Sequence, residues 1–139
     1  MTAVIGPATR PFADSTDSLL RFAMRADATL TGLAGLAVAA AADPISSLTG
    51  LTSAQEYAFG AFFVFYGLAV FSLAALPNLR SAGIGVVIAN IVYTVAAVAA
   101  VAADSLPLTA AGIAATLASG VYTAFFAYLQ YLGVRRLRA

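Results

Sequence analysis

The side chains that carry most protein chemistry are largely missing from this chain. Its 139 residues include no cysteine and no histidine, and all seven basic residues are arginine. These absences remove cysteine-based metal and redox sites, histidine acid–base catalysis and lysine Schiff bases. A hydroxyl with no base beside it is a poor nucleophile. The sequence therefore predicts a protein that is not an enzyme and that uses no metal or cofactor.

One amide lies deep within the third apolar stretch. An amide without a partner in hydrocarbon costs several kcal/mol, so Asn90 needs a hydrogen bond from the protein or from a bound molecule. We expect a hydroxyl of the fourth stretch, Thr116, Ser119 or Thr123, with a lipid or quinone head group as the alternative. The candidate site, for helix packing or for a lipophile, comprises Asn90, Thr94, Thr116, Ser119, Tyr122 and Thr123.

A second group of candidates is charged and lies where the first apolar stretch begins. Asp17, Arg21 and Arg25 are four residues apart, so they share a helix face and Asp17 can pair with Arg21. We interpret Asp27 as an interfacial residue in a charge network with Arg21 and Arg25; coupling of a small molecule at Asp27 is the alternative. The arginines could also contact anionic lipid. The predicted inner-interface cluster comprises Arg21, Arg25, Asp27, Arg135 and Arg136.

Helices must position these residues, because 62% of the chain is hydrophobic and only 9% is charged, far from a soluble domain of this size. A helix needs about 20 apolar residues to cross the hydrocarbon core. Four segments qualify, which predicts an all-α, polytopic membrane protein with an antiparallel up-down-up-down four-helix bundle. We expect an N-terminal tail over 1–17 and a transmembrane domain over 18–139, with helices near 18–42, 55–76, 81–103 and 108–134.

The charges between these segments predict their orientation. Arginines fall on the N-terminal tail, on the turn that contains Arg80 and on the C-terminal tail, while Asp43, Glu56 and Asp104 occupy the other two connections. Short loops that carry arginine stay in the cytoplasm. Both termini are therefore expected to be cytoplasmic, and the alanine-rich, lysine-free composition favours a bacterial inner membrane.

The first outer connection is longer than the others and places apolar residues at helical spacing, which predicts a short surface helix between 43 and 54. Its exit, Ser53 to Glu56, fits a capping box that starts the second long helix. The alternative is that Glu56 lies in headgroup water. Glycines at Gly35, Gly60 and Gly67 predict close helix packing through small residues.

Several short motifs resemble those of small, uncharacterised four-helix integral membrane proteins of actinobacteria. They are Leu19 to Asp27 with Thr31-Gly32 and Gly35-Leu36, the lone Asn90, and Phe126 to Gln130 followed by Arg135-Arg136. The resemblance implies the four-helix architecture and a bacterial inner membrane. It implies no catalytic residues.

Three functions fit these features. The first is a non-enzymatic accessory or scaffold subunit that associates through its helix faces, in a larger membrane complex or a homo-oligomer. The second is a binder or carrier of lipid or another lipophile, with a site between the third and fourth helices. The third is a small transporter, disfavoured because every acidic residue is expected at a membrane edge. Membrane lipids are expected partners, and the net charge of +1 excludes a nucleic-acid footprint.

Overall fold

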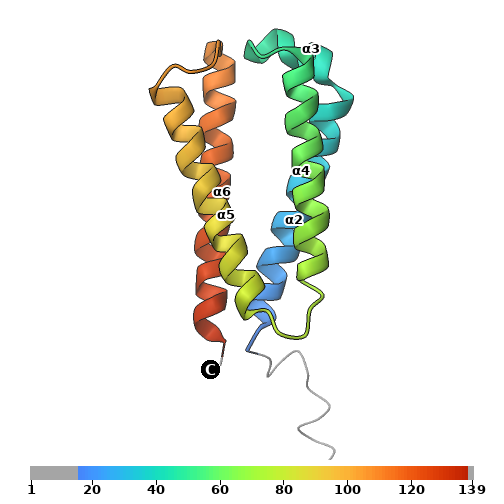
Figure 1. Cartoon of the computed structure of the whole chain (residues 1–139), viewed down its shortest axis with the longest axis vertical. Helices are drawn as coiled ribbons and strands as arrows, with labels where there is room; N and C mark the ends of the chain where they lie inside the picture. Colours follow the sequence, from blue (N-terminus) through green and yellow to red (C-terminus); the bar gives the residue numbers. More distant parts are fainter. Residues whose placement is uncertain (1–15, 138–139) are drawn as a thin grey trace, which may run out of the picture.

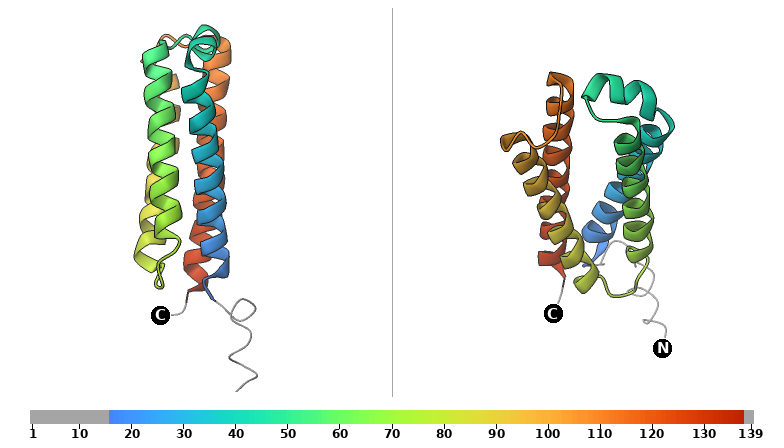
Figure 2. Two further views of the ribbon diagram at one scale, coloured as in Figure 1. Left: turned by 90° about the vertical axis from the view of Figure 1, so that its right-hand side faces the viewer. Right: turned by 45° about the horizontal axis from the view of Figure 1, so that its top comes forward.

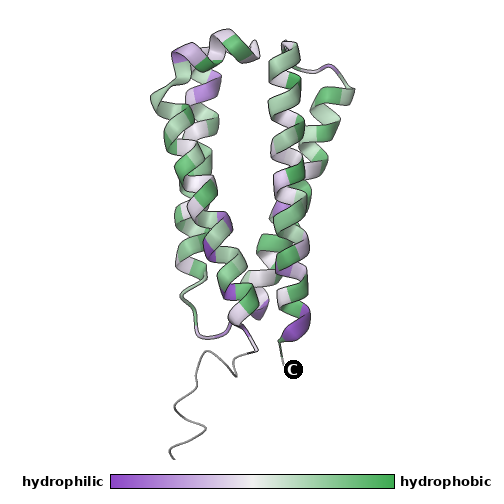
Figure 3. Cartoon of the chain, turned by 180° about the vertical axis from the view of Figure 1, so that it is seen from behind, coloured by the Kyte–Doolittle hydropathy of each residue, from purple (hydrophilic) through white to green (hydrophobic). Residues whose placement is uncertain are grey.

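The computed structural model describes residues 16–137, and this part of the chain is helical with no strand, which confirms the all-α prediction for it. Residues 1–15 and 138–139, which include Arg10 and Arg138 of the predicted tails, lie outside the described part. The helices are α2 (Ser18–Ala40), α3 (Ala42–Thr49), α4 (Ser53–Leu73), α5 (Arg80–Ala102) and α6 (Ala110–Arg136). Figure 3 shows long helices that are mainly hydrophobic, with hydrophilic residues near their ends and at a few places within their lower halves.

Several of these helices are long and apolar enough to cross a membrane. α4, α5 and α6 each meet this condition alone, and α2 meets it together with α3, across a bend of 92°. The first predicted span, 18–42, therefore ends two residues early. A proline explains the bend: in a straight helix the ring of Pro44 would clash with the carbonyl of Ala40 and remove one hydrogen bond. The chain turns at Ala41 and starts α3 instead.

The four long helices form two hairpins. α2 packs along α4, α5 packs along α6, and successive long helices run in opposite directions (Figure 1). The hairpins meet at the end where α2 begins and α6 ends, here termed the lower end, and diverge toward the upper end, where α3 lies across the α2/α4 hairpin (Figure 2). This splayed arrangement creates the site described below.

Small residues let the hairpins meet at the lower end. A Cβ on Gly133 would lie 2.7 Å from the Cα of Leu20, and a Cβ on Gly83 would lie 2.7 Å from the Cδ2 of the same residue. Leu20 is fully buried in a cluster that includes Met24 and Leu79. The hydrophobic core is therefore concentrated below the polar site, and it closes that end of the bundle.

A contact between α3 and α6 joins the hairpins at the upper end. The amide of Thr109 donates to the carbonyl of Thr49 over 2.9 Å, and the Thr109 hydroxyl donates to the carbonyl of Leu48. Gly50 ends α3 with φ of 89°, and a Cβ there would lie 2.2 Å from the carbonyl oxygen of Pro107. Only glycine suits both the conformation and the space.

α4 begins at Ser53, two residues before the predicted start at 55, and its capping box is shifted by one residue. The capping box pairs Thr52 with Gln55, not Ser53 with Glu56. This shift releases Glu56, which is buried and accepts a hydrogen bond from Thr49. The prediction that Glu56 lies in headgroup water is therefore also wrong, because a capping threonine one position earlier leaves its carboxylate free to turn into the bundle.

Candidate functional site

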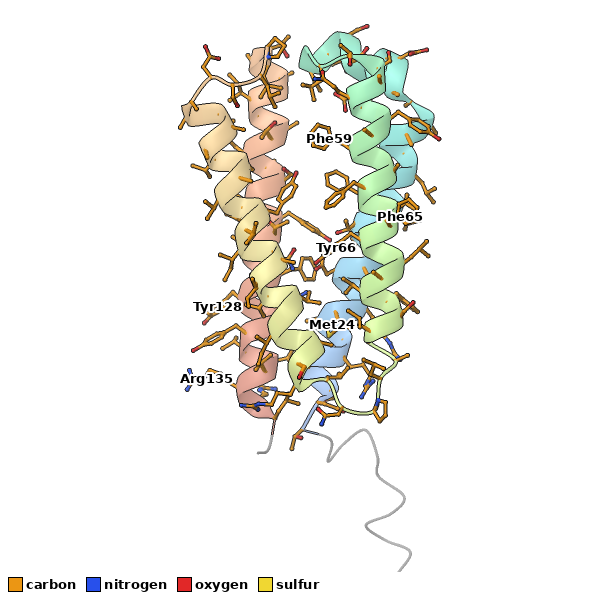
Figure 4. All side chains as sticks on the ribbon, in the orientation of Figure 1. Met24, Phe59, Phe65, Tyr66, Tyr128 and Arg135 are labelled. Atoms are coloured by element: carbon orange, nitrogen blue, oxygen red, sulfur yellow. The ribbon has the colours of Figure 1, made fainter. Side chains whose placement is uncertain are left out.

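A carboxylate lies at the junction of all four long helices. Asp27 of α2 is completely buried, and its Oδ2 accepts hydrogen bonds from Asn90 Nδ2 of α5 and Gln130 Nε2 of α6, both over 2.9 Å. The Tyr66 hydroxyl of α4 lies 3.0 Å from the same oxygen. Figure 4 shows Tyr66 pointing from α4 toward the α5/α6 hairpin. One polar side chain from each helix therefore meets at Asp27.

The other carboxylate oxygen has its own partners. Thr31 Oγ1, one turn along α2, lies 3.0 Å from Asp27 Oδ1, and the Tyr122 hydroxyl of α6 lies 3.1 Å from it. The two hydroxyls are 2.9 Å apart. We term the whole group the central cluster: Asp27, Thr31, Tyr66, Asn90, Tyr122 and Gln130. Every buried side-chain polar atom in the described part of the chain has at least one hydrogen-bond partner, so no buried polar atom of the cluster is isolated.

This geometry corrects the predicted charge network of Asp27 with Arg21 and Arg25. Arg21 pairs with Asp17 over 2.7 Å, as predicted, and donates to the carbonyls of Ala74 and Leu76, just beyond α4. Arg25 is exposed. Two residues along a helix correspond to a rotation of about 200°, so Arg25 and Asp27 point to different faces.

The two C-terminal arginines of the predicted inner-interface cluster, Arg135 and Arg136, do not contact Asp27 either. Arg135 lies over the ring of Tyr131, with 5.8 Å from its guanidinium carbon to the ring centroid. Arg136 is exposed. Both belong to the last turn of α6, where positive charge complements the helix dipole.

Asn90 is buried as expected, but its partners differ from the predicted hydroxyls. Its amide nitrogen donates to Asp27 and also to Gln130 Oε1 over 2.8 Å, and its amide oxygen lies 3.1 Å from the Tyr66 hydroxyl. The predicted hydroxyls of α6 bond elsewhere because they lie on turns nearer the upper end than Asn90 does. Thr123 contacts Thr94 over 2.6 Å, so these two predicted residues do form a seam between α5 and α6.

The remaining predicted residues lie above this seam. Ser119 is 2.9 Å from the Tyr93 hydroxyl and donates to the carbonyl of Thr116. Thr116 donates to the carbonyl of Gly112 in its own helix. The six predicted residues therefore spread along α5 and α6, and only Asn90 and Tyr122 belong to the central cluster.

A cavity of about 310 Å³ opens directly above the central cluster, between the two hairpins. All four long helices contribute to its wall, and the cluster residues Thr31, Tyr66, Asn90 and Tyr122 form part of it. We term it the central cavity. Its other lining residues are mainly apolar: Leu30, Ala34, Phe62, Phe63, Ala89, Tyr93, Ser119 and Thr123.

A second cavity of about 430 Å³ continues toward the upper end. It contains the buried Glu56 and its partner Thr49, and it shares Phe63, Tyr93 and Ser119 with the central cavity. The rings of Phe63 and Tyr93 meet edge to face, with centroids 6.0 Å apart. These two aromatic side chains, from opposite hairpins, therefore form the partition between the two cavities.

Sequence reasoning missed Tyr66 and the central place of Asp27, and named Gln130 only as the end of the motif that starts at Phe126. The height of each polar residue along its helix is the signal that could have identified the cluster. At 1.5 Å per residue, Asp27 lies about 14 Å above the start of α2, Asn90 about 15 Å above the start of α5, and Gln130 about 9 Å above the end of α6. Three strongly polar side chains at similar depth on three helices are expected to meet.

The described part of the chain contains no group of three or more His, Cys, Asp or Glu side chains that could hold a metal ion. Comparison with known proteins finds no matching family model, curated protein or solved structure. The resemblance to actinobacterial membrane proteins therefore stays a prediction based on short motifs.

Proposed function

We propose that this chain is a four-span protein of a bacterial inner membrane, and that it binds a lipophilic ligand in the central cavity. One observation carries the proposal: an apolar cavity lies between the hairpins, with hydrogen-bonding groups of the central cluster on its wall. Ligand sites in proteins combine these two features, a mainly apolar wall and a few fixed polar groups.

The site differs from the one predicted between the third and fourth helices, because it lies between two hairpins and includes α2 and α4. Carrier function is compatible with this arrangement, since the hairpins pack tightly at the lower end and diverge above it (Figure 1). An accessory or scaffold role stays a prediction. The many exposed apolar side chains on the outer faces are also what contact with lipid requires.

The orientation can be tested directly, because the chain has no native cysteine. The arginine distribution places the turn at Asn78 in the cytoplasm and α3 outside. We expect Ser47→Cys to react with a membrane-impermeant maleimide on intact cells. Asn78→Cys should react only after the membrane is permeabilised, and the reverse pattern would refute this orientation.

Filling the central cavity should abolish ligand retention. Ala89 lines the cavity from α5, so Ala89→Leu adds bulk where the ligand would lie, without touching Asp27. Wild-type protein purified in mild detergent is expected to retain a lipophilic molecule detectable by native mass spectrometry. The variant should retain roughly tenfold less, because overpacking costs about 1–3 kcal/mol.

The matched control is Ala99→Leu, which is exposed on the same helix and lines neither cavity. It should retain ligand like the wild type, since lipid on the outer faces is unaffected by either change. Equal retention by all three proteins would contradict the proposal. So would a wild-type protein that retains nothing after incubation with a total membrane-lipid extract.

A further inference from the structure

Among residues 16–137, no positively charged side chain pairs with Asp27. The ion pair found among residues 16–137 joins Arg21 to Asp17, and Arg25, Arg135 and Arg136 are exposed. The side chains that face Asp27 from all four long helices are hydroxyls and amides. These groups can hydrogen-bond a buried carboxylate, but they leave its net charge, which is costly away from water unless an opposite charge or a proton neutralises it. Since no described side chain supplies that charge, a proton or a bound cation can do so.

The central cluster has a place for a proton. Tyr66 has one hydroxyl hydrogen but two acceptors, Asp27 Oδ2 at 3.0 Å and Asn90 Oδ1 at 3.1 Å. With Asp27 ionised, one of these contacts lacks a hydrogen. A proton on Oδ2 completes both, because Asp27 then donates to Tyr66 and Tyr66 donates to Asn90. The geometry therefore accommodates the protonated and the ionised carboxyl.

The central cavity suits a particular kind of positive charge. Its wall includes the aromatic rings of Phe62, Phe63, Tyr66, Tyr93 and Tyr122. Aromatic faces attract cations, more strongly where water is excluded. A hydrated metal ion would lose its water shell against this apolar wall, whereas an organic cation with apolar substituents would bury them there.

Building on the proposed function, we propose that the ligand is a lipophilic organic cation that exchanges with one proton at Asp27. Binding of the cation releases the proton from the carboxyl group, so the site stays neutral before and after the exchange. Tyr66 and Tyr122 are the other titratable groups that face Asp27. A phenol is a far weaker acid than a carboxyl group, so the released proton is assigned to Asp27.

The exchange can be measured on the wild-type protein alone. Methyltriphenylphosphonium, a compact aromatic cation, is added to the purified protein in weakly buffered detergent solution that contains a pH indicator. We expect release of about one proton per bound cation, and an affinity that falls as pH falls, because protonated Asp27 has no charge to offer. Binding without proton release and without pH dependence would overturn the proposal, as would no binding.

A variant pair isolates the charge of Asp27. Asp27→Asn keeps the shape of the side chain and removes its charge, while Asp43→Asn changes an exposed acid in α3. Asp27→Asn should bind the cation at least about 30-fold more weakly and release no proton, and Asp43→Asn should match the wild type. If Asp27→Asn does not fold, the wild-type proton release and pH profile still decide the question.

A neutral probe separates failure of this inference from failure of the proposed function. Triphenylphosphine oxide resembles the cation in shape but carries no net charge. If it binds as well as the cation, and Ala89→Leu weakens both, the lipophile site stands and the cation assignment falls. If Ala89→Leu changes neither the binding of these probes nor the retention of native lipophiles, the proposed function falls as well.

Discussion

Replacement of Asp27 by leucine is expected to lower the free energy of unfolding by about 3 kcal/mol or more. The change removes the acceptor for Asn90 Nδ2 and Gln130 Nε2, and both residues are buried, with 2% and 0% of their surface exposed. Their hydrogens would be left without partners at the junction of the helices. Chemical or thermal unfolding of the purified protein in detergent, followed by circular dichroism, measures the effect.

Two further variants test whether the loss of stability is specific to the hydrogen-bond network of Asp27. Asp43→Leu, a change of the same kind at an exposed position, should alter stability by less than about 0.5 kcal/mol. The triple change of Asp27, Asn90 and Gln130 to leucine should be less damaging than the sum of the three single changes, because it removes donors together with their acceptor. Additive effects would show that the three side chains do not form one network.

The apolar part of the fold could be predicted from the sequence because hydropathy depends on local composition. The segments that became α4, α5 and α6 each contain an apolar run of sufficient length, and prolines fall between the long helices. A short helix between 43 and 54 was predicted and α3 confirms it, but the sharp bend at Ala41 was not predicted. The apolar pattern continues through it, and the clash that Pro44 would cause appears only when residue 40 is considered as part of the same helix.

The central cluster could be predicted only in part. Asn90 was identified because an amide within an apolar run needs a partner wherever the helices lie. Asp27 was misplaced because its neighbours Arg21 and Arg25 suggested an interface, whereas its own side chain points the other way into the bundle. The expectation that every acidic residue lies at a membrane edge, which disfavoured a small transporter, loses its support because Asp27 is buried among the four long helices.

Tyr66 shows a different limit of sequence reasoning. It lies in the segment Phe62 to Tyr66, which is aromatic except for Val64 and in which each aromatic side chain looks equally suited to packing or to lipid contact. The structure separates them: Tyr66 is half-buried against Asp27, while Phe65 is 72% exposed and points away from the bundle (Figure 4). This difference depends on helix rotation, which a pattern of small and large residues leaves undetermined in so alanine-rich a chain.

The second large effect on stability is expected at Gly60, where α2 and α4 pack against each other. A Cβ on Gly60 would lie 2.6 Å from the amide nitrogen of Ala39 and 2.7 Å from the carbonyl oxygen of Gly35. Both atoms belong to the backbone, so no side chain can rotate to make room. We expect Gly60→Ala to lower the free energy of unfolding by about 1–3 kcal/mol, because the two helices must separate to accept one methyl group.

Gly85 is the matched control, since a Cβ there would meet no atom within 4 Å. It lies inside α5, where alanine favours the helix over glycine, so Gly85→Ala should raise the free energy of unfolding by up to about 1 kcal/mol. The same substitution in two helices is therefore expected to change stability in opposite directions, as measured by unfolding in detergent. Equal effects would mean that α2 and α4 do not approach closely at Gly60. The hairpin that supplies Asp27 and Tyr66 would then lack the rigid seam on which the proposed site depends.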